Sequence, residues 1–291
     1  MSKHAYLIMA HAAFGQLRQL ITLLDDSRND IFIHIDSKAG EVNYNDFMNC
    51  VKCSQIFFTK RRSVTWGGDS QVKLEMDMIE DVISRGQYEY LHLLSGMDFP
   101  IKSKKFIFDF FDKHKGCEFV MIDKNKDNET AIQRCNKHYF FQNKIGRENK
   151  RFYKAIQQGV LCIEGRIGYS RIPSSLRKSY HKGPNWFSIT GEFAKYVISR
   201  KDWVSKNFSH TICADEVFLQ TLLWNSHFRD NIYVNDSLKY SNLRITDWQR
   251  GNPYVWQNDD IDFLIHSPYL FARKFDTVSD NYIYNRIKLL N

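Results

Sequence analysis

Proline and glycine are scarce in this chain, and low-complexity tracts are absent. The 291 residues include 5 prolines and 14 glycines, and no segment repeats at the spacing of a solenoid protein. The apolar fraction is 43%, which is enough to form a sizeable buried core. These features exclude a disordered chain and a repeat array, and they favour a single domain over residues 1–291.

Long hydrophobic runs are also missing. The apolar stretch within the N-terminal MSKHAYLIMAHAAFGQL is too short to span a membrane, and its pattern indicates a strand followed by a helix, not a signal peptide. We therefore expect a cytoplasmic protein whose six cysteines are reduced thiols. Cys50-Val-Lys-Cys53 is a lone pair without a second pair or a histidine at metal-finger spacing, so zinc or redox chemistry is disfavoured.

Positive charge is in excess. The formal net charge is +8 and the pI is about 9.0, so the surface should attract an anionic partner. The densest basic runs, at 60–62 and 144–154, are not flanked by a zinc finger or an RNP signature, which disfavours a nucleic-acid partner. We expect instead a nucleotide-sugar diphosphate as substrate and peripheral contact with the anionic inner face of a membrane.

Short apolar strands alternate with helical segments along the first hundred residues. Strands are predicted at 5–10, 31–35, 54–59 and 88–94, with helices after the first strand and over 69–84. This order is typical of an α/β domain with an open, mostly parallel sheet flanked by helices. Ligands of such sheets bind beyond the carboxyl ends of the strands, where Asp36 and Asp98 lie.

The second half is less regular. Residues 123–155 form the most polar segment and are predicted to be an insertion, followed by a strand at 186–190 and helices at 191–200 and 215–224. Asp215 would cap the last helix and leave Glu216 in its first turn. Such a pair is usually a cap and a dipole partner, although Glu216 is also a candidate general base.

Six segments, in the same order along the chain, resemble one known family, the core 2/I-branching beta-1,6-N-acetylglucosaminyltransferase and peptide O-xylosyltransferase family (glycosyltransferase family 14). The chain resembles a bacterial-type member of this family, one that builds surface polysaccharide. They are His34-Ile35-Asp36-Ser37-Lys38, Ser63–Gly68 with its Trp-Gly-Gly turn, Leu94–Lys102, Gly183–Thr190, Ala214-Asp215-Glu216 and Leu270–Asp276.

The resemblance implies a GT-A-type domain that moves a sugar, GlcNAc in the first place and xylose as the alternative, from UDP to a saccharide or glycolipid hydroxyl with inversion. Carried over by position, Glu216 is the base, Asp36 a uridine contact, Asp98 a sugar contact and Lys274 a diphosphate contact with Arg244 or Arg250 as its partner. Trp186 and Asp215 would lie on the acceptor side, although Trp186, like Trp66, is equally well a core aromatic.

No metal is expected to act with these residues. The loop after the fourth predicted strand offers only Asp98, and the single Asp-x-Asp, Asp260-Ile261-Asp262, is better explained as a helix start. Two other functional classes remain open at this stage: a saccharide- or nucleotide-binding module that has lost turnover, and a basic nucleic-acid-binding protein.

Overall fold

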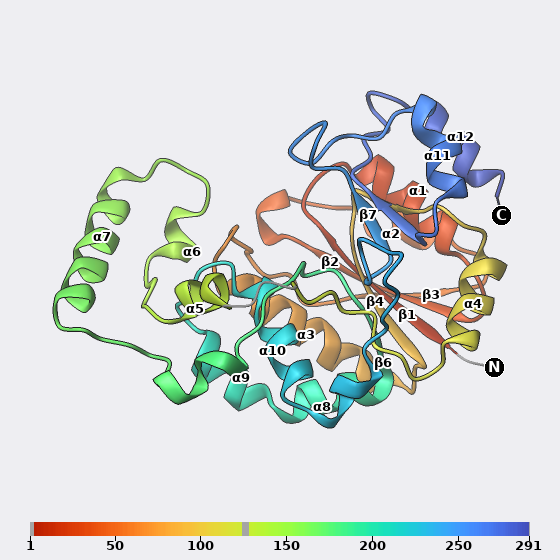
Figure 1. Ribbon diagram of the computed structural model, residues 1–291. Coiled ribbons are helices and arrows are strands. Elements are labelled where there is room, and N and C mark those ends of the chain that lie inside the picture. The colour runs from red at the N-terminus through yellow and green to blue at the C-terminus, as the bar shows by residue number, and fades with distance from the viewer. Residues whose placement is uncertain (1–2, 124–127, 291) are drawn as a thin grey trace.

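A five-stranded sheet forms the centre of the molecule, for which the computed structural model describes residues 3–123 and 128–290 (Figure 1). The strand order is β3-β2-β1-β4-β6, where β1 is His4–Ala10, β2 Asn29–Ile35, β3 Gln55–Phe58, β4 Tyr90–Ser95 and β6 Ser188–Thr190. The first four strands are parallel and β6 joins the β4 edge antiparallel. The predicted α/β class with an open, mostly parallel sheet is confirmed.

The sheet is buried on both faces because its strands are apolar on both. In β1, Tyr6 and Ile8 point into a core cluster that includes helix α1 (Phe14–Leu24), whereas Ala5 and Leu7 point into a second cluster that includes α3 (Ser70–Arg85). The α1 side also holds α4 (Lys104–Lys113), α11 (Ile261–His266) and α12 (Tyr282–Lys288). The α3 side holds α8 (Gly191–Ser199), α9 (Lys201–Phe208) and α10 (Phe218–Trp224).

The carboxyl ends of the parallel strands meet at one edge of the sheet. Ala10 of β1 pairs in register with Ile35 of β2, and Met9 pairs with Ser95 of β4. Two hydrogen bonds continue this register past the strand ends, from Asp36 N to Ala10 O at 2.9 Å and from Gly96 N to Met9 O at 3.0 Å. The loops after β2 and β4 therefore lie on either side of the end of β1, as the parallel pattern predicted.

A second, three-stranded sheet brings the C-terminal part of the chain to this edge. Its order is β5-β8-β7, where β5 is Asp98–Pro100, β7 Arg244–Thr246 and β8 Phe271–Arg273. In the β5 and β8 pair, Asp98 lies opposite Arg273. The small sheet thus places the end of β8, and Lys274 after it, beside the loop that follows β4.

An arm extends from the body of the molecule at the α3 side (Figure 1). It contains α5 (Glu129–Cys135), α6 (Gln142–Ile145) and α7 (Arg151–Arg166). The polar segment predicted as an insertion at 123–155 lies in this arm, which continues to the end of α7, and residues 124–127 of that segment lie outside the described part. The remaining short elements are α2 (Asn45–Met48), η1 (Ser37–Ala39), η2 (Ser174–Ser179), η3 (Ala214–Glu216), η4 (His227–Asn231) and η5 (Asn258–Asp260). Within 3–123 and 128–290, none of the helices combines the length and the hydropathy that crossing a membrane requires.

Candidate active site

Asp36 lies directly after β2 and is almost fully buried. Its Oδ1 accepts a hydrogen bond from Lys38 N at 2.8 Å and its Oδ2 accepts one from Val64 N at 3.2 Å, while Lys38 Nζ lies 3.7 Å from Oδ2. The carboxylate therefore fastens the 63–68 segment to the sheet edge. Its predicted contact with uridine stays a prediction.

His34, the other polar residue of the His-Ile-Asp segment, has a structural role. Its Nε2 accepts a hydrogen bond from Arg62 N at 2.9 Å. Burial lowers the pKa of His34 to about 4, so the ring is neutral at physiological pH and can act as this acceptor. This hydrogen bond ties the end of β2 to the segment that precedes the Trp-Gly-Gly turn.

Asp98 and Trp186 are brought together by Arg273. Arg273 Nη1 lies 3.2 Å from Asp98 Oδ1 and 3.2 Å from Ser95 Oγ, and its guanidinium covers the Trp186 ring at 4.4 Å from the ring centroid. Ser95 donates to both carboxylate oxygens of Asp98, from N at 2.7 Å and from Oγ at 2.9 Å. Trp186 is only partly buried, so this group can present an aromatic and charged surface to a ligand.

Lys274 follows β8, and the two arginines expected to accompany it differ in their surroundings. Arg244 is buried, and its guanidinium donates to Asn242 O, to Phe187 O and to Ser188 Oγ at 3.0 Å; burial lowers the pKa of Arg244 to about 9. It therefore holds the 187–188 segment in place. Arg250 is exposed and pairs with Asp247 and Asp260.

Arg250 also lies close to the segment that follows β8 and carries Lys274. Its guanidinium is 4.0 Å from the centroid of the Tyr254 ring, and Lys274 N donates to Tyr254 O at 3.4 Å. Trp256 completes the link, because its backbone N donates to Lys274 O at 2.9 Å and its indole donates to Arg273 O at 2.8 Å. Of the two candidate arginines, Arg250 is thus the one that lies at the surface beside Lys274.

Glu216 lies in η3, where two basic side chains hold one of its oxygens. Arg134 Nη1 from α5 is 2.5 Å from Glu216 Oε2, and Lys182 Nζ is 3.7 Å from the same oxygen. Lys182 also pairs with Asp123 at 2.9 Å. Among the described residues Oε1 of Glu216 has no hydrogen-bond or ion-pair partner, and about a third of the side chain is exposed. One oxygen is anchored and the other is open to a ligand.

Asp215 does not cap a helix, which corrects the sequence prediction. Its Oδ2 accepts a hydrogen bond from Gln71 Nε2 of α3 at 3.0 Å, and Oδ1 is buried without a hydrogen-bond partner among the described residues. Burial, together with the neighbouring Glu216 carboxylate, raises the pKa of Asp215 to about 7. Asp215 is thus held on the core side, by Gln71 of α3, next to Glu216 in the sequence.

A third carboxyl group, that of Glu75 on α3, lies in the same cluster. Glu75 is fully buried and both of its side-chain oxygens are without a well-formed hydrogen bond among the described residues. Burial raises the pKa of Glu75 well above its usual range, with a further contribution from the Asp215 charge and a small opposing one from the Asn185 amide. Burial thus favours the protonated, uncharged form of Glu75.

The Trp-Gly-Gly turn positions the segment that carries Asp215 and Glu216. Gly67 O accepts a hydrogen bond from Cys213 N at 2.8 Å. Gly67 has φ +70°, and a Cβ there would lie 3.1 Å from Cys213 Sγ, so both the backbone conformation and the tight contact favour glycine. Cys213 itself has φ +48°, an uncommon conformation for a residue with a side chain, and Arg134 helps to hold it by donating to Cys213 O at 3.2 Å. Trp66 of this turn is 48% exposed and is not a core residue.

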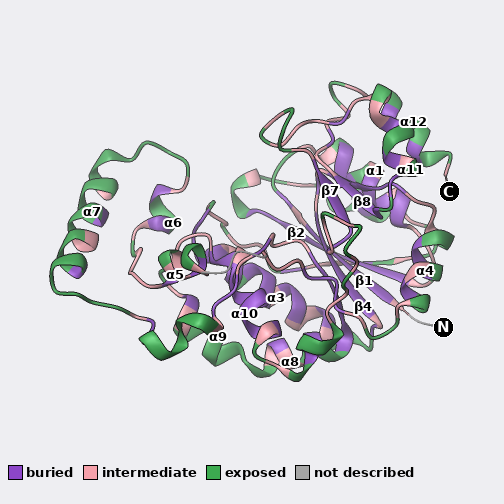
Figure 2. Ribbon diagram, in the orientation of Figure 1, coloured by how far each residue is buried: buried purple, intermediate pink, exposed green. Residues whose placement is uncertain are grey.

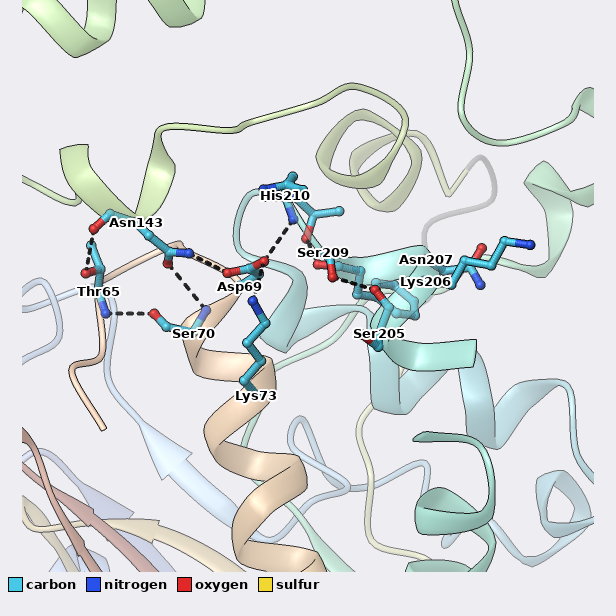
Figure 3. Close-up of polar contacts among 12 residues, drawn as sticks. Thr65, Asp69, Ser70, Lys73, Asn143, Ser205, Lys206, Asn207, Ser209 and His210 are labelled. Carbon is cyan, nitrogen blue, oxygen red and sulfur yellow. Dashed lines mark hydrogen bonds and ion pairs between the residues drawn. The ribbon is translucent and has the colours of Figure 1, made fainter. Parts of the chain in front are cut away.

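A polar network joins this turn to the arm and to the loop before η3 (Figure 3). Asp69 accepts hydrogen bonds from Asn143 Nδ2 at 2.5 Å and His210 N at 2.9 Å, and Lys73 Nζ lies 3.1 Å away. Thr65 Oγ1 donates to Asn143 O at 3.0 Å. Burial alone would raise the pKa of Asp69, but these hydrogen bonds and the Lys73 charge together lower it. The network therefore holds the base of the arm, α3 and the 209–213 loop together around one ionised carboxylate.

The 182–186 segment connects the two groups of candidate residues. Gly183 N donates to Glu216 O at 3.0 Å, and a Cβ at Gly183 would lie 1.9 Å from Met121 O, so only glycine fits. The segment begins with Lys182 at Glu216 and ends with Trp186 under Arg273. A surface cavity of about 500 Å³ lies elsewhere, between α1 and the residues around Thr277, and none of the predicted site residues lines it.

Three residues of the site were not predicted from the sequence. Arg134 and Lys182 reach Glu216 from segments 82 and 34 residues away, and no local motif marks them. Glu75 lies inside the predicted helix 69–84, where it occupies an interior position that a charged residue rarely takes. An acidic residue on the apolar face of that helix was the only available signal.

Comparison with known proteins adds a family to this geometry. The family model described as "Branch: Core-2/I-Branching enzyme" matches residues 4–262. Xylosyltransferase 2 of Canis lupus familiaris is 25% identical over 304 residues, which cover 94% of this chain and 32% of that protein. Xylosyltransferase 1 of Homo sapiens is 24% identical over 314 residues, which cover 97% of this chain and 30% of that protein. The chain thus spans about a third of the length of these curated relatives.

Among solved structures, mouse xyloside xylosyltransferase 1 in its apo form aligns with a TM-score of 0.39 and 8% sequence identity, over 94% of this chain and 97% of that one.

Proposed function

Since the chain belongs to the Core-2/I-Branching enzyme family, we propose that it is an inverting glycosyltransferase that moves a sugar from a UDP-sugar to a saccharide hydroxyl. The observation that carries the proposal is the arrangement of Glu216, whose Oε2 is held by Arg134 and Lys182 while Oε1 is left without a partner among the described residues. GlcNAc is the proposed sugar. Xylose is the second candidate, because relatives that cover this chain are named xylosyltransferases.

Glu216 would act as the general base. The acceptor hydroxyl gives its proton to Oε1 of Glu216 while its oxygen attacks the anomeric carbon of the donor, and the bond from that carbon to the diphosphate oxygen breaks, so that UDP leaves with the electron pair. Because Arg134 and Lys182 hold the other carboxylate oxygen, the base is fixed in one orientation during this step. Attack from the side opposite to the departing diphosphate inverts the anomeric configuration.

The charge that develops on UDP would be stabilised by side-chain cations. Lys274 and Arg250 are the proposed pair, because Arg250 is exposed beside the Tyr254 and Lys274 backbone, whereas Arg244 is enclosed. Asp36 at the end of β2 would contact the uridine. The proposed sugar contacts are Asp98 and Trp186, which Arg273 brings together.

We propose that transfer proceeds without a divalent metal. The two carboxylates of the Asp-x-Asp sequence are already paired with arginines, Asp260 with Arg250 and Asp262 with Arg286, each at 2.8 Å. They lie at the junction of η5 and α11, as predicted for a helix start. Asp98, which begins β5 directly after the loop that follows β4, is engaged by Ser95 and Arg273.

The proposal is tested by measuring UDP release from a panel of UDP-sugars with saccharide acceptors, in excess EDTA and with added Mn²⁺. We expect turnover with UDP-GlcNAc, or with UDP-xylose as the second candidate, that resists EDTA and is lost in Lys274→Ala. Lys288→Ala, an exposed lysine of α12, is the matched control and should keep full activity. Activity abolished by EDTA and restored by Mn²⁺ would contradict the side-chain mechanism. UDP-sugar binding without release under any condition would favour the binding-module alternative.

A further inference from the structure

Helix α7 of the arm carries an apolar stripe on its solvent side. Phe152, Ile156 and Ile163 are 72%, 37% and 60% exposed, and Ile167, which ends the helix, is 70% exposed. The last three lie four, eleven and fifteen residues after Phe152, so all four fall within about 60° of one another around the helix. In Figure 2 most of the α7 ribbon has the green of exposed residues.

The polar side of the same helix faces the protein. Gln157 and Glu164 are its buried residues. Gln157 accepts a hydrogen bond from Phe141 N at 3.1 Å and donates to His138 O at 2.7 Å, while Glu164 accepts from His138 N at 3.1 Å and contacts His138 Nδ1 at 2.6 Å. A surface helix of a globular protein normally buries its apolar side. In α7 the orientation is reversed, and hydrogen bonds fix it.

The stretch that runs from α6 through α7 into η2 carries nearly all of the excess charge of the chain. Residues 144–178 contain nine lysines and arginines and two glutamates, a net charge of +7, whereas the whole chain has +8. Arg151 and Arg166, both exposed, are on α7 itself, beside the apolar stripe. An exposed apolar stripe next to clustered positive charge has the composition of a helix that lies in a membrane interface and binds anionic lipid.

We propose that α7 docks the protein on an anionic lipid bilayer, with Phe152, Ile156, Ile163 and Ile167 inserted among the headgroups and acyl chains and the basic residues of 144–178 at the lipid phosphates. Charge complementarity selects this occupant, because the whole chain has a net charge of +8 and residues 144–178 account for +7 of it. The proposal stands on the arm alone and does not depend on the reaction that the site performs.

The test is co-sedimentation with vesicles of phosphatidylglycerol mixed with phosphatidylcholine, compared with vesicles of phosphatidylcholine alone. Wild-type protein should bind the anionic vesicles, and added salt should weaken this binding. Phe152→Ser with Ile163→Ser should lower the partition coefficient by about tenfold or more, since two inserted side chains are lost. The matched control, Val278→Ser with Leu289→Ser, removes two apolar side chains that are 91% and 82% exposed elsewhere and should have no effect.

A second pair of variants separates the charge contribution. Arg151→Glu with Arg166→Glu should also lower binding by about tenfold or more, whereas Lys113→Glu with Lys288→Glu, an equal change of charge at exposed sites on the body, should lower it far less. All variants change exposed residues, so unchanged thermal unfolding verifies that they are folded. Equal binding to both vesicle types, or equal loss in the arm and control variants, would overturn the proposal. If the wild-type protein does not bind vesicles but forms a dimer, and the Phe152→Ser with Ile163→Ser variant is monomeric, a second copy of the chain covers α7 and the proposal is overturned.

Discussion

Asp215→Asn should make the protein more stable at alkaline pH than the natural sequence is. The Asp215 carboxyl is buried, one of its oxygens has no partner among the described residues, and its pKa is raised from 3.8 to about 7 by burial and by the Glu216 charge. The folded state therefore holds a proton that the unfolded state has released at intermediate pH. The unfolding free energy of the natural protein is unaffected at pH values below the pKa of Asp215 in the unfolded state. It declines as the pH rises towards about 7, the pKa in the folded state, and stays reduced at higher pH.

The size of the effect follows from that difference in pKa. A separation of about three pH units corresponds to about 4 kcal/mol of unfolding free energy at the alkaline limit. Between about pH 5 and about pH 8 the natural protein should lose about 2 to 3 kcal/mol that the asparagine variant keeps. The asparagine can still accept the hydrogen bond from Gln71, but its amide group then occupies the unpartnered position at a constant cost of about 1 to 3 kcal/mol.

Urea unfolding at a series of pH values is the appropriate assay, because the constant cost cancels when only the pH dependence is compared. The difference in unfolding free energy between Asp215→Asn and the natural protein should move in favour of the variant as the pH rises from about 5 to about 8. Asp259→Asn, which removes an exposed carboxylate of η5, is the control and should follow the natural protein in parallel. If the Asp215→Asn curve is also parallel, Asp215 is ionised in the folded protein and the reasoning is refuted.

Three further outcomes are expected. Glu216→Gln should keep UDP-sugar binding in calorimetry but lower turnover by about 10² to 10⁴, the usual contribution of a positioned base, and near-normal transfer would remove Glu216 from the mechanism. Asp36→Ala should raise the donor KM more than it lowers kcat, because a uridine contact is uniform binding; a pure kcat defect would contradict that placement. Asp69→Asn should lower the unfolding free energy by about 1 to 3 kcal/mol at neutral pH, since the Lys73 pair and the His210 hydrogen bond favour the ionised form. Because folding lowers the pKa of Asp69, the ionised carboxylate stabilises the protein at pH values above the pKa of the unfolded state, and this stabilisation is lost as the pH falls through the pKa of the folded state. The unfolding free energies of Asp69→Asn and the natural protein, measured in urea, should therefore converge in acid. A difference that stays constant with pH would contradict this role of Asp69.

The strands and the place of the site edge were predictable because they depend on local patterns. Buried parallel strands are continuous apolar runs, and the predicted strands at 5–10, 31–35, 54–59 and 88–94 agree with β1, β2, β3 and β4 to within two residues at each end. A carboxylate that follows such a run must lie at the carboxyl edge of the sheet. Asp36 and Asp98 were placed correctly on that basis.

The surroundings of Glu216 were not predictable, because they depend on contacts between distant segments. The helix predicted to begin at Asp215 is a 3-10 turn followed by a break at Val217, whose φ and ψ are −130° and −41°, before α10 begins at Phe218. Cys213 takes a left-handed conformation that its sequence neighbours do not announce, and Gly67 and Arg134 hold it from 146 and 79 residues away. Local propensity yields here to tertiary contacts.

The orientation of α7 shows the same limit in another form. An alternation of apolar and polar residues at helical spacing predicts a helix with two unlike sides, and the usual inference is that the apolar side faces the core. Only the partners of Gln157 and Glu164 reveal that the polar side is the one attached to the protein. Neither of these hydrogen-bonding patterns has a sequence signature. The basic run at 144–154 was a sequence signal for an anionic partner, but only the structure connects that charge to an exposed apolar stripe. The sequence pattern thus determines that α7 has an apolar and a polar side, and its hydrogen bonds to residues 138 and 141 determine which side faces the protein.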